Sequence, residues 1–209
     1  MSIQVSVIDY GLGNLHSVVK AFRHAGADVH VVGEPDGIAS ANRLVLPGVG
    51  AFGDGIASLR NRGMVDSLKA YMESGRPFLG ICLGMQLLMA QSEEFGSHSG
   101  LDVIPGRVVG LCQRPGVKVP QIGWNRIVPR PGGTWRGSIL ETTVPNTMVY
   151  FVHSLAPAPE HEDHRLADAS YGGSRICAAV QRENVVGCQF HPEKSGPAGL
   201  AILSRFLAL

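Results

Sequence analysis

The chain has 209 residues, of which 44% are hydrophobic and 17% charged, which is enough for one globular domain with a substantial core. Eighteen basic against seventeen acidic residues leave a net charge of +1, so no strong field attracts nucleic acid or an anionic membrane. The N-terminal "MSIQVSVIDY" lacks a basic region and a cleavage pattern, and no apolar run approaches the roughly 20 residues of a membrane span. We therefore expect a cytoplasmic protein with a single domain over residues 1–209.

The cysteines lie at positions 82, 112, 177 and 188 and show neither CxxC spacing nor the density of a disulfide scaffold. Reduced thiols are therefore expected, one of them a candidate for reactivity. His161 and His164 lie in an acidic loop without a convincing third ligand. We predict no metal and no cofactor.

The first ninety residues alternate strand and helix patterns. Apolar or β-branched runs predict strands over 3–8, 28–32, 43–48 and 77–81. Apolar spacing predicts helices over 15–26, over 53–75 with an interruption near residue 63, and from 85 to about 93. This alternation is typical of an α/β fold with a doubly wound, mostly parallel sheet flanked by helices. Sites in such folds lie beyond the carboxyl ends of the strands, which selects the loops 9–14, 47–53 and 80–84.

The middle of the chain has a different pattern. Short extended runs over 106–116, 117–133 and 147–155 are interrupted by proline and glycine, which predicts additional antiparallel strands and irregular loops. The segments 165–171, 174–181 and 185–193 continue as strands. A helix over 196–209 ends the chain, with Pro197 suited to its first turn.

A cysteine between two glycines follows the strand predicted over 77–81. In "GICLG" (80–84), a strand-turn-helix of this form holds Cys82 in a strained backbone conformation at a helix N-terminus. The helix terminus favours thiolate, and the N–H of Leu83 can donate to an oxyanion. Taken alone, the pattern also fits a buried cysteine that serves as a small hydrophobe.

A nucleophile needs a base, and "FHPE" supplies a candidate pair. His191 follows the apolar run 185–190, so it also lies at a carboxyl strand end. Pro192 fixes its own backbone angle, which lets Glu193 turn back to orient the imidazole, as in a catalytic triad. A surface histidine and glutamate after a strand would show the same local pattern. The combination with Cys82 favours the catalytic interpretation.

With these motifs the chain resembles the triad (class I) glutamine amidotransferases, whose fold is flavodoxin-like. Among them it is similar to the glutaminase subunits of imidazole glycerol phosphate synthase. The blocks "IDYGLGNL", "LPGVGAFGDG", "GICLGMQLL", "GWN", "YFVHS" and "QFHPEKSG" occur in the same order, from residue 8 to 196. The resemblance implies that Cys82 attacks the glutamine side-chain amide, with His191 as base and Glu193 as its orienter.

The resemblance also implies the remaining site residues. The second oxyanion donor would come from a peptide flip in "PGVG", at Val49 and Gly50, and would complement Leu83. Glutamine would be bound by Gln86, Glu94, His153 and Ser154, the last two through main-chain contacts. Glu94 also fits a solvated charge at a helix end.

Since ammonia at neutral pH is mostly ammonium, a partner that captures it is expected. In the family the partner is a (β/α)8-barrel cyclase subunit, which forms a heterodimer and receives ammonia through a channel. It makes imidazole glycerol phosphate and an aminoimidazole carboxamide ribotide in histidine biosynthesis. By resemblance, the partner interface comprises Asn14, Gln121, Trp124, Asn125, Tyr150 and Lys194. Trp124 also fits a half-buried core residue.

One position departs from the family pattern. The usual Pro-His-Met or Pro-His-Ile before "GWN" is here Pro120-Gln121-Ile122. Gln121 keeps hydrogen-bonding capacity but cannot take a proton. This puts coupling between the two proteins in doubt, or indicates a paralogue that supplies another synthase, for example one modifying surface sugars. Further alternatives are a free-standing thiol hydrolase and a binding protein without catalytic activity.

Overall fold

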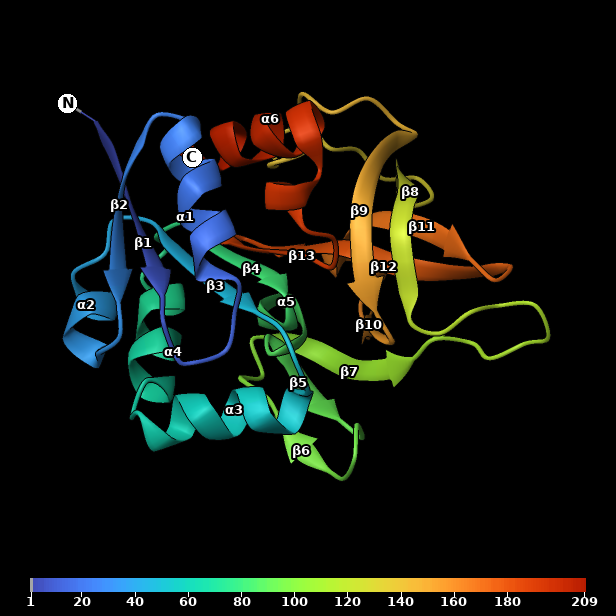
Figure 1. Cartoon of the computed structure of the whole chain (residues 1–209), viewed down its shortest axis with the longest axis horizontal. Coiled ribbons are helices and arrows are strands. Elements are labelled where there is room, and N and C mark those ends of the chain that lie inside the picture. The colour runs from blue at the N-terminus through green and yellow to red at the C-terminus, as the bar shows by residue number, and fades with distance from the viewer. Residues whose placement is uncertain (1) are drawn as a thin grey trace.

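The computed structural model describes residues 2–209 and is built around a nine-stranded sheet over that range (Figure 1). Five neighbouring strands run parallel, in the order β2 (Ala27–Val32), β1 (Ile3–Ile8), β3 (Leu44–Gly48), β4 (Phe78–Cys82) and β13 (Val185–Cys188). The antiparallel strands that follow are β12 (Ser174–Arg182), β11 (Arg165–Tyr171), β8 (Gln121–Pro129) and β9 (Thr147–His153). The predicted fold class is confirmed.

Helices cover both faces of the parallel strands. They are α1 (Leu15–His24), α2 (Pro35–Ala39), α3 (Phe52–Asn61), α4 (Val65–Glu73), α5 (Leu83–Gln86) and α6 (Gly196–Leu207), with short 3-10 turns η1 (Glu162–His164) and η2 (Pro192–Lys194). In β3, Val45 packs into the cluster that contains α1 and α6, whereas Leu44 and Leu46 pack with α2, α3 and α4. Burial on both faces explains why β3 and β4 are continuous apolar runs.

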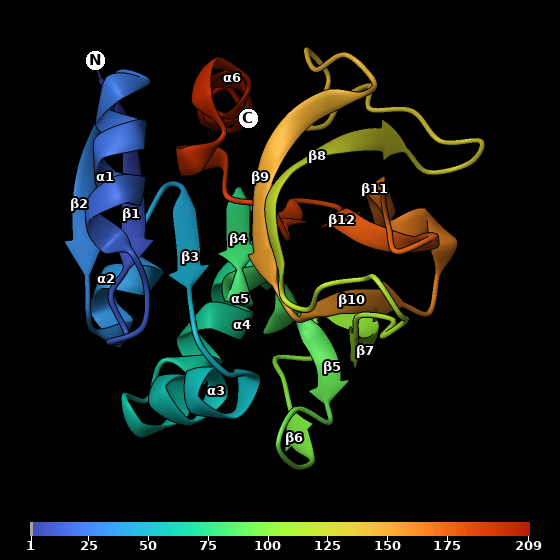
Figure 2. The ribbon, with the colours of Figure 1, turned by 45° about the vertical axis from the view of Figure 1, so that its right-hand side comes forward.

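A smaller sheet lies beside the large one and has the order β10 (Leu155–Pro159), β7 (Ile104–Gly110), β5 (Met89–Ser92) and β6 (His98–Ser99). The long strands β8 and β9 run side by side and curve strongly (Figure 2). Because β9 continues directly into β10, residues 153–155 join the two sheets. This junction borders the candidate site.

The helix predicted from 85 to about 93 is wrong. Helix α5 ends at Gln86, and residues 89–92 form β5 instead. The reason is that a returning segment takes the carbonyl groups that a helix would use: Leu101 N donates to Leu87 O at 2.9 Å and Ile104 N to Leu88 O at 3.0 Å. A short buried apolar run fits helix and strand equally, so the sequence pattern did not distinguish them.

Candidate active site

Cys82 lies at a sharp turn between β4 and α5. Its φ is +56°, a left-handed conformation that non-glycine residues rarely adopt. The neighbouring glycines are required sterically, because a Cβ on Gly84 would lie 1.8 Å from Leu46 O and one on Gly80 would lie 2.6 Å from Gly84 O. The predicted strained turn is present. Since α5 has four residues, its dipole at Cys82 is weaker than the predicted longer helix would provide.

His191 and Glu193 lie at the same edge of the sheet as Cys82. Strand β13 pairs in parallel with β4, so the two strands have their carboxyl ends together. His191 Nδ1 is 2.8 Å from Glu193 Oε1, with exposed side-chain fractions of 3% and 1%. Glu193 therefore turns back onto the imidazole, as the sequence predicts. His191 and Cys82 line one cavity of about 300 Å³.

The electrostatics of His191 favour its protonated form. Burial disfavours the charged imidazole, but the attraction of Cys82 and Glu193 outweighs it and raises the pKa to about 9. Nε2 of His191 nevertheless has no hydrogen-bond partner within residues 2–209. Cys82 therefore raises this pKa without a well-aligned hydrogen bond to Nε2, and catalytic groups that align only when substrate binds are common in unliganded enzymes.

The predicted oxyanion residues border the same cavity. Val49, Gly50 and Leu83 line it with Cys82, and Gly48 is the register partner of Cys82 in the β3–β4 ladder. Gly50 has a φ of +101°, a conformation that a residue without Cβ adopts easily. Both backbone segments thus border the cavity that contains Cys82.

The predicted substrate residues also line this cavity: Gln86, Glu94, His153 and Ser154. Glu94 follows β5, and its Oε2 accepts a hydrogen bond from Phe52 N at 2.7 Å, at the start of α3. It is therefore fixed in place rather than a solvated charge at a helix end. Gln86 is 5% exposed, and its Nε2 donates to Leu155 O and to Gln189 Oε1, each at 3.0 Å. These contacts turn the Gln86 amide toward the protein.

His153 is held as a neutral imidazole. Burial lowers its pKa to about 4, and the bond to Leu155 only partly offsets this. Nδ1 lies 2.8 Å from Leu155 O, which can only accept, so Nδ1 carries the proton and Nε2 is bare. Nε2 lies 3.2 Å from the Gln121 side-chain amide, which must therefore present its NH2 group.

Gln121 does not lie on the surface as an interface residue would. It is 3% exposed and pairs with His153 across the β8–β9 ladder. The inward side of β8 buries its side chain, and direct contact with a partner stays a prediction. Gln121 instead contacts the cavity through His153.

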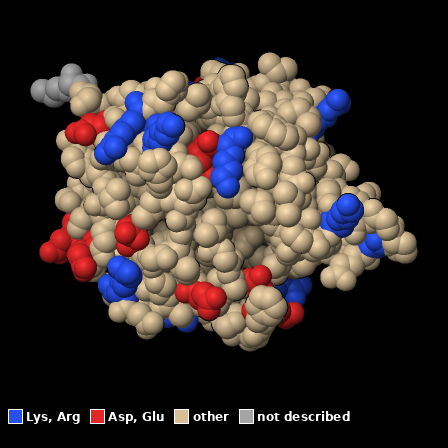
Figure 3. Space-filling view, in the orientation of Figure 1, with Lys and Arg blue, Asp and Glu red and all other residues tan. Residues whose placement is uncertain are grey.

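The outer face of β8 and β9 carries exposed apolar side chains, with the exposed Arg126 opposite Met148 at one end. Ile122, Trp124 and Met148 have exposed fractions of 63%, 52% and 42%, and the Trp124 ring meets that of Tyr150 edge-on at 6.0 Å. Lys194 Nζ lies 6.0 Å from the Tyr150 ring centroid. The surface over these strands carries few charged side chains (Figure 3). We call Ile122, Trp124, Met148 and Tyr150 the apolar face. Trp124 and Tyr150 are predicted interface residues, and Lys194, a third, borders the face.

The two predicted interface asparagines have structural contacts. Asn125 Nδ2 donates to Ser170 O at 2.9 Å, which ties β8 to the end of β11. Asn14 caps α1, since its Oδ1 accepts from Ser17 N at 3.3 Å. Neither side chain belongs to the apolar face.

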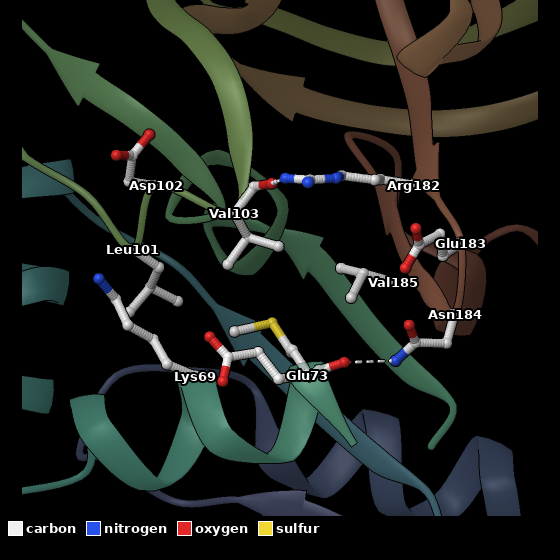
Figure 4. Close-up of a pocket in the computed structure, with 10 residues that line it drawn as sticks. Lys69, Glu73, Leu101, Asp102, Val103, Arg182, Glu183, Asn184 and Val185 are labelled. Carbon is white, nitrogen blue, oxygen red and sulfur yellow. Dashed lines mark hydrogen bonds between the residues drawn. The ribbon is translucent and has the colours of Figure 1, made fainter. Parts of the chain in front are cut away.

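A second cavity, of about 230 Å³, lies at the opposite end of β4 and β13 (Figure 4). Two of its polar side chains bond to the backbone of neighbouring segments: Asn184 Nδ2 donates to Met72 O at 2.9 Å and Arg182 donates to Val103 O. Its lining shares no residue with the cavity at Cys82. We therefore place the chemistry at Cys82.

Gln189 is a site residue that the sequence interpretation missed. It is fully buried, two residues before His191, and its Nε2 lies 3.7 Å from Cys82 Sγ. The available signal was an uncharged polar residue at the end of an otherwise apolar run. Its contact with a cysteine 107 positions earlier could not be inferred from that signal.

Metal sites and membrane spans are not found in the described part of the chain. Over residues 2–209, no three or more His, Cys, Asp or Glu side chains group in a way that would hold a metal ion. Within the same range, no helix is long and apolar enough to cross a membrane.

Residues 6–209 match the family described as glutamine amidotransferase class-I, and the chain belongs to that family. A chain of the solved PurLQS structure from Thermotoga maritima is similar in fold, with a TM-score of 0.76 at 19% identity, covering 100% of this chain and 99% of that one. A second solved structure, of a glutamine amidotransferase, gives a TM-score of 0.73 at 16% identity, covering 98% and 99%.

Within the family, the chain belongs with the HisH subunits. It is 49% identical to imidazole glycerol phosphate synthase subunit HisH 1 of Legionella pneumophila strain Paris, over 98% of this chain and 99% of the relative. It is 50% identical to the subunit HisH of Syntrophotalea carbinolica, over 97% and 98%. The resemblance noted from the sequence motifs is confirmed.

Proposed function

We propose that residues 1–209 form one domain that hydrolyses glutamine at Cys82 and supplies the ammonia to a cyclase partner, as the glutaminase subunit of imidazole glycerol phosphate synthase in histidine biosynthesis. The observation that carries the chemistry is the common cavity lined by Cys82 and the Glu193-bound His191. The names of the HisH relatives support the choice of synthase.

The reaction has two steps. The sulfur of Cys82 attacks the side-chain carbonyl carbon of glutamine, and His191 protonates the departing nitrogen, so that the C–N bond breaks and ammonia leaves. His191 then accepts a proton from water, whose oxygen attacks the thioester carbon; the C–S bond breaks, glutamate leaves and the Cys82 thiolate is restored. Each step passes through a tetrahedral oxyanion; the Leu83 N–H and, after a peptide flip, an N–H from residues 49–50 would bind it, and these residues line the cavity.

The apolar face is the proposed docking surface for the cyclase. Monomers rarely leave aromatic and aliphatic side chains together on an open strand pair, and such surfaces commonly mark interfaces. Val152 lies two residues after Tyr150 in β9, so both side chains are on the same face of the strand. Val152 also lines the active-site cavity. A partner on this face would therefore cover the side of the molecule on which ammonia is formed.

The decisive experiment mixes the chain with the (β/α)8-barrel cyclase and its nucleotide substrate, supplying glutamine but no ammonium salt. We expect imidazole glycerol phosphate to form. The complex with Cys82→Ala should form product from ammonium salt and none from glutamine. Glutaminase activity in Cys82→Ala would refute the assignment of the nucleophile.

Other outcomes favour the alternatives. Product from ammonium salt but not from glutamine, with the wild-type chain, would favour a paralogue that supplies another synthase, as the Gln121 departure suggests. Full activity of the isolated chain, without stimulation by the liganded cyclase, would favour a free-standing hydrolase.

A further inference from the structure

Within residues 2–209, Cys82 Sγ makes hydrogen-bond contacts with two polar groups, and they favour opposite charge states. The carbonyl of Val152 lies 3.9 Å from the sulfur and can only accept, so it favours the thiol. Gln189 Nε2 lies 3.7 Å from the sulfur and donates, so it favours the thiolate. Gln189 is 0% exposed, so water does not compete for this contact.

The direction of the Gln189 amide follows from chemistry. Leu155 O can only accept, so the group of Gln86 that contacts it is the NH2 group. The same NH2 group contacts Gln189 at 3.0 Å, so the Gln189 atom there is the carbonyl oxygen. The NH2 group of Gln189 therefore points to Cys82. The backbone carbonyl of Leu155 thus orients the amide of Gln86, and the Gln86 amide in turn orients that of Gln189.

We propose that Gln189 is a further catalytic residue, a buried donor that stabilises the Cys82 thiolate, and that Gln86 is the positioning residue that keeps this donor aimed at the sulfur. With the proton on His191, the negative charge on the Cys82 sulfur accepts the Gln189 N–H. This proposal deepens the function proposed above and rests on Cys82 being the nucleophile.

The thiolate can be measured without turnover. The rate of Cys82 alkylation by iodoacetamide is followed as a function of pH, with the modified peptide identified by mass spectrometry because Cys112 is exposed and also reacts. In Gln189→Leu we expect the midpoint of the Cys82 profile to rise by about one pH unit, with an approximately tenfold lower rate below the midpoint.

Gln181→Leu is the matched control, because Gln181 lies on the adjacent strand β12 and its Nε2 contacts Glu183 O. Its alkylation profile should equal that of the wild type. Gln86→Leu, which leaves Gln189 unoriented, should shift the midpoint in the same direction by a smaller amount. That variant also tests the proposal if Gln189→Leu does not fold.

In the cyclase complex, Gln189→Leu should lower kcat for glutamine about tenfold with a smaller change in KM, since the donor acts on the sulfur. An unchanged alkylation midpoint in both Gln189→Leu and Gln86→Leu would overturn the proposal. A shifted midpoint in a chain that shows no glutaminase activity would instead support the donor and refute the proposed function.

Discussion

Glu193 Oε1 lies 2.8 Å from Nδ1 of His191, and the protein buries both groups almost completely. The carboxylate fixes the imidazole so that Nε2 is left for the reaction, and it stabilises the positive charge that forms during proton transfer. Removing the charge while keeping the shape therefore tests the orienting role directly.

Glu193→Gln should lower kcat for glutamine hydrolysis by about a hundredfold or more, because a positioned acid–base group contributes about that much. The measurement is steady-state glutaminase activity in the cyclase complex. Glu183→Gln, an exposed glutamate in the β12–β13 turn, is the control and should retain wild-type activity. Wild-type kcat in Glu193→Gln would contradict the orienting role.

The stability of the fold should depend on pH through His191. Its pKa is about 9 in the folded protein and about 6.5 when unfolded. The folded state binds this proton more tightly than the unfolded state. The contribution of His191 to the free energy of unfolding is therefore complete below pH 6.5 and is lost as the pH rises through 9. Urea unfolding should therefore give a free-energy difference between wild type and His191→Asn that shrinks from pH 6.5 to pH 9. A constant difference would contradict the raised pKa.

Gly84→Ala should disrupt the turn that displays Cys82. Its new Cβ would lie 1.8 Å from Leu46 O, a contact that forces the backbone to move. We expect the free energy of unfolding to fall by about 2 kcal/mol or more, as for overpacked cores, together with loss of glutaminase activity. Gly110→Ala is the matched control, since nothing lies within 4 Å of its Cβ position. Equal stabilities in urea unfolding would show that the turn tolerates a side chain.

Trp124→Ala should weaken binding to the cyclase while leaving the fold intact. Trp124 is 52% exposed, and its ring lies beside that of Tyr150 on the apolar face. Truncating an interface tryptophan commonly costs about 2 kcal/mol or more, so the Kd should rise about thirtyfold. Isothermal titration with the cyclase measures the Kd, and Val144→Ala, another exposed apolar residue, is the control. Equal affinities for both variants would place the docking surface elsewhere.

Local patterns predicted those features that depend on residues close together in the chain. Glycine spacing around Cys82 predicted the strained turn, because steric limits on the backbone act over two or three residues. The contact of His191 with Glu193 spans two residues and follows from the intervening proline. The alternation of strands and helices through α4 similarly follows from the spacing of apolar side chains.

Errors arose where distant segments compete for the same groups. Residues 89–92 pair as β5 because the segment 100–104 takes the carbonyls of Leu87 and Leu88. The β8–β9 register likewise turns Gln121 toward His153, a contact that the sequence pattern did not predict. The spacing of apolar residues shows which side chains are buried. It does not show which distant backbone groups will hydrogen-bond to that segment.

By itself the sequence determined the fold class, the turn at Cys82, and the His191–Glu193 pair, since each depends on local sterics or on a recognisable motif. Only the tertiary structure decided that Gln189 donates to the sulfur of Cys82 and that the amide of Gln86 faces inward to orient it. The direction of those two amides depends on a single carbonyl, Leu155 O, contributed by a strand some seventy residues beyond Gln86. The direction of a hydrogen bond depends on both the donor and the acceptor. Here the acceptor comes from a distant segment, which is brought next to Gln86 only when the chain folds.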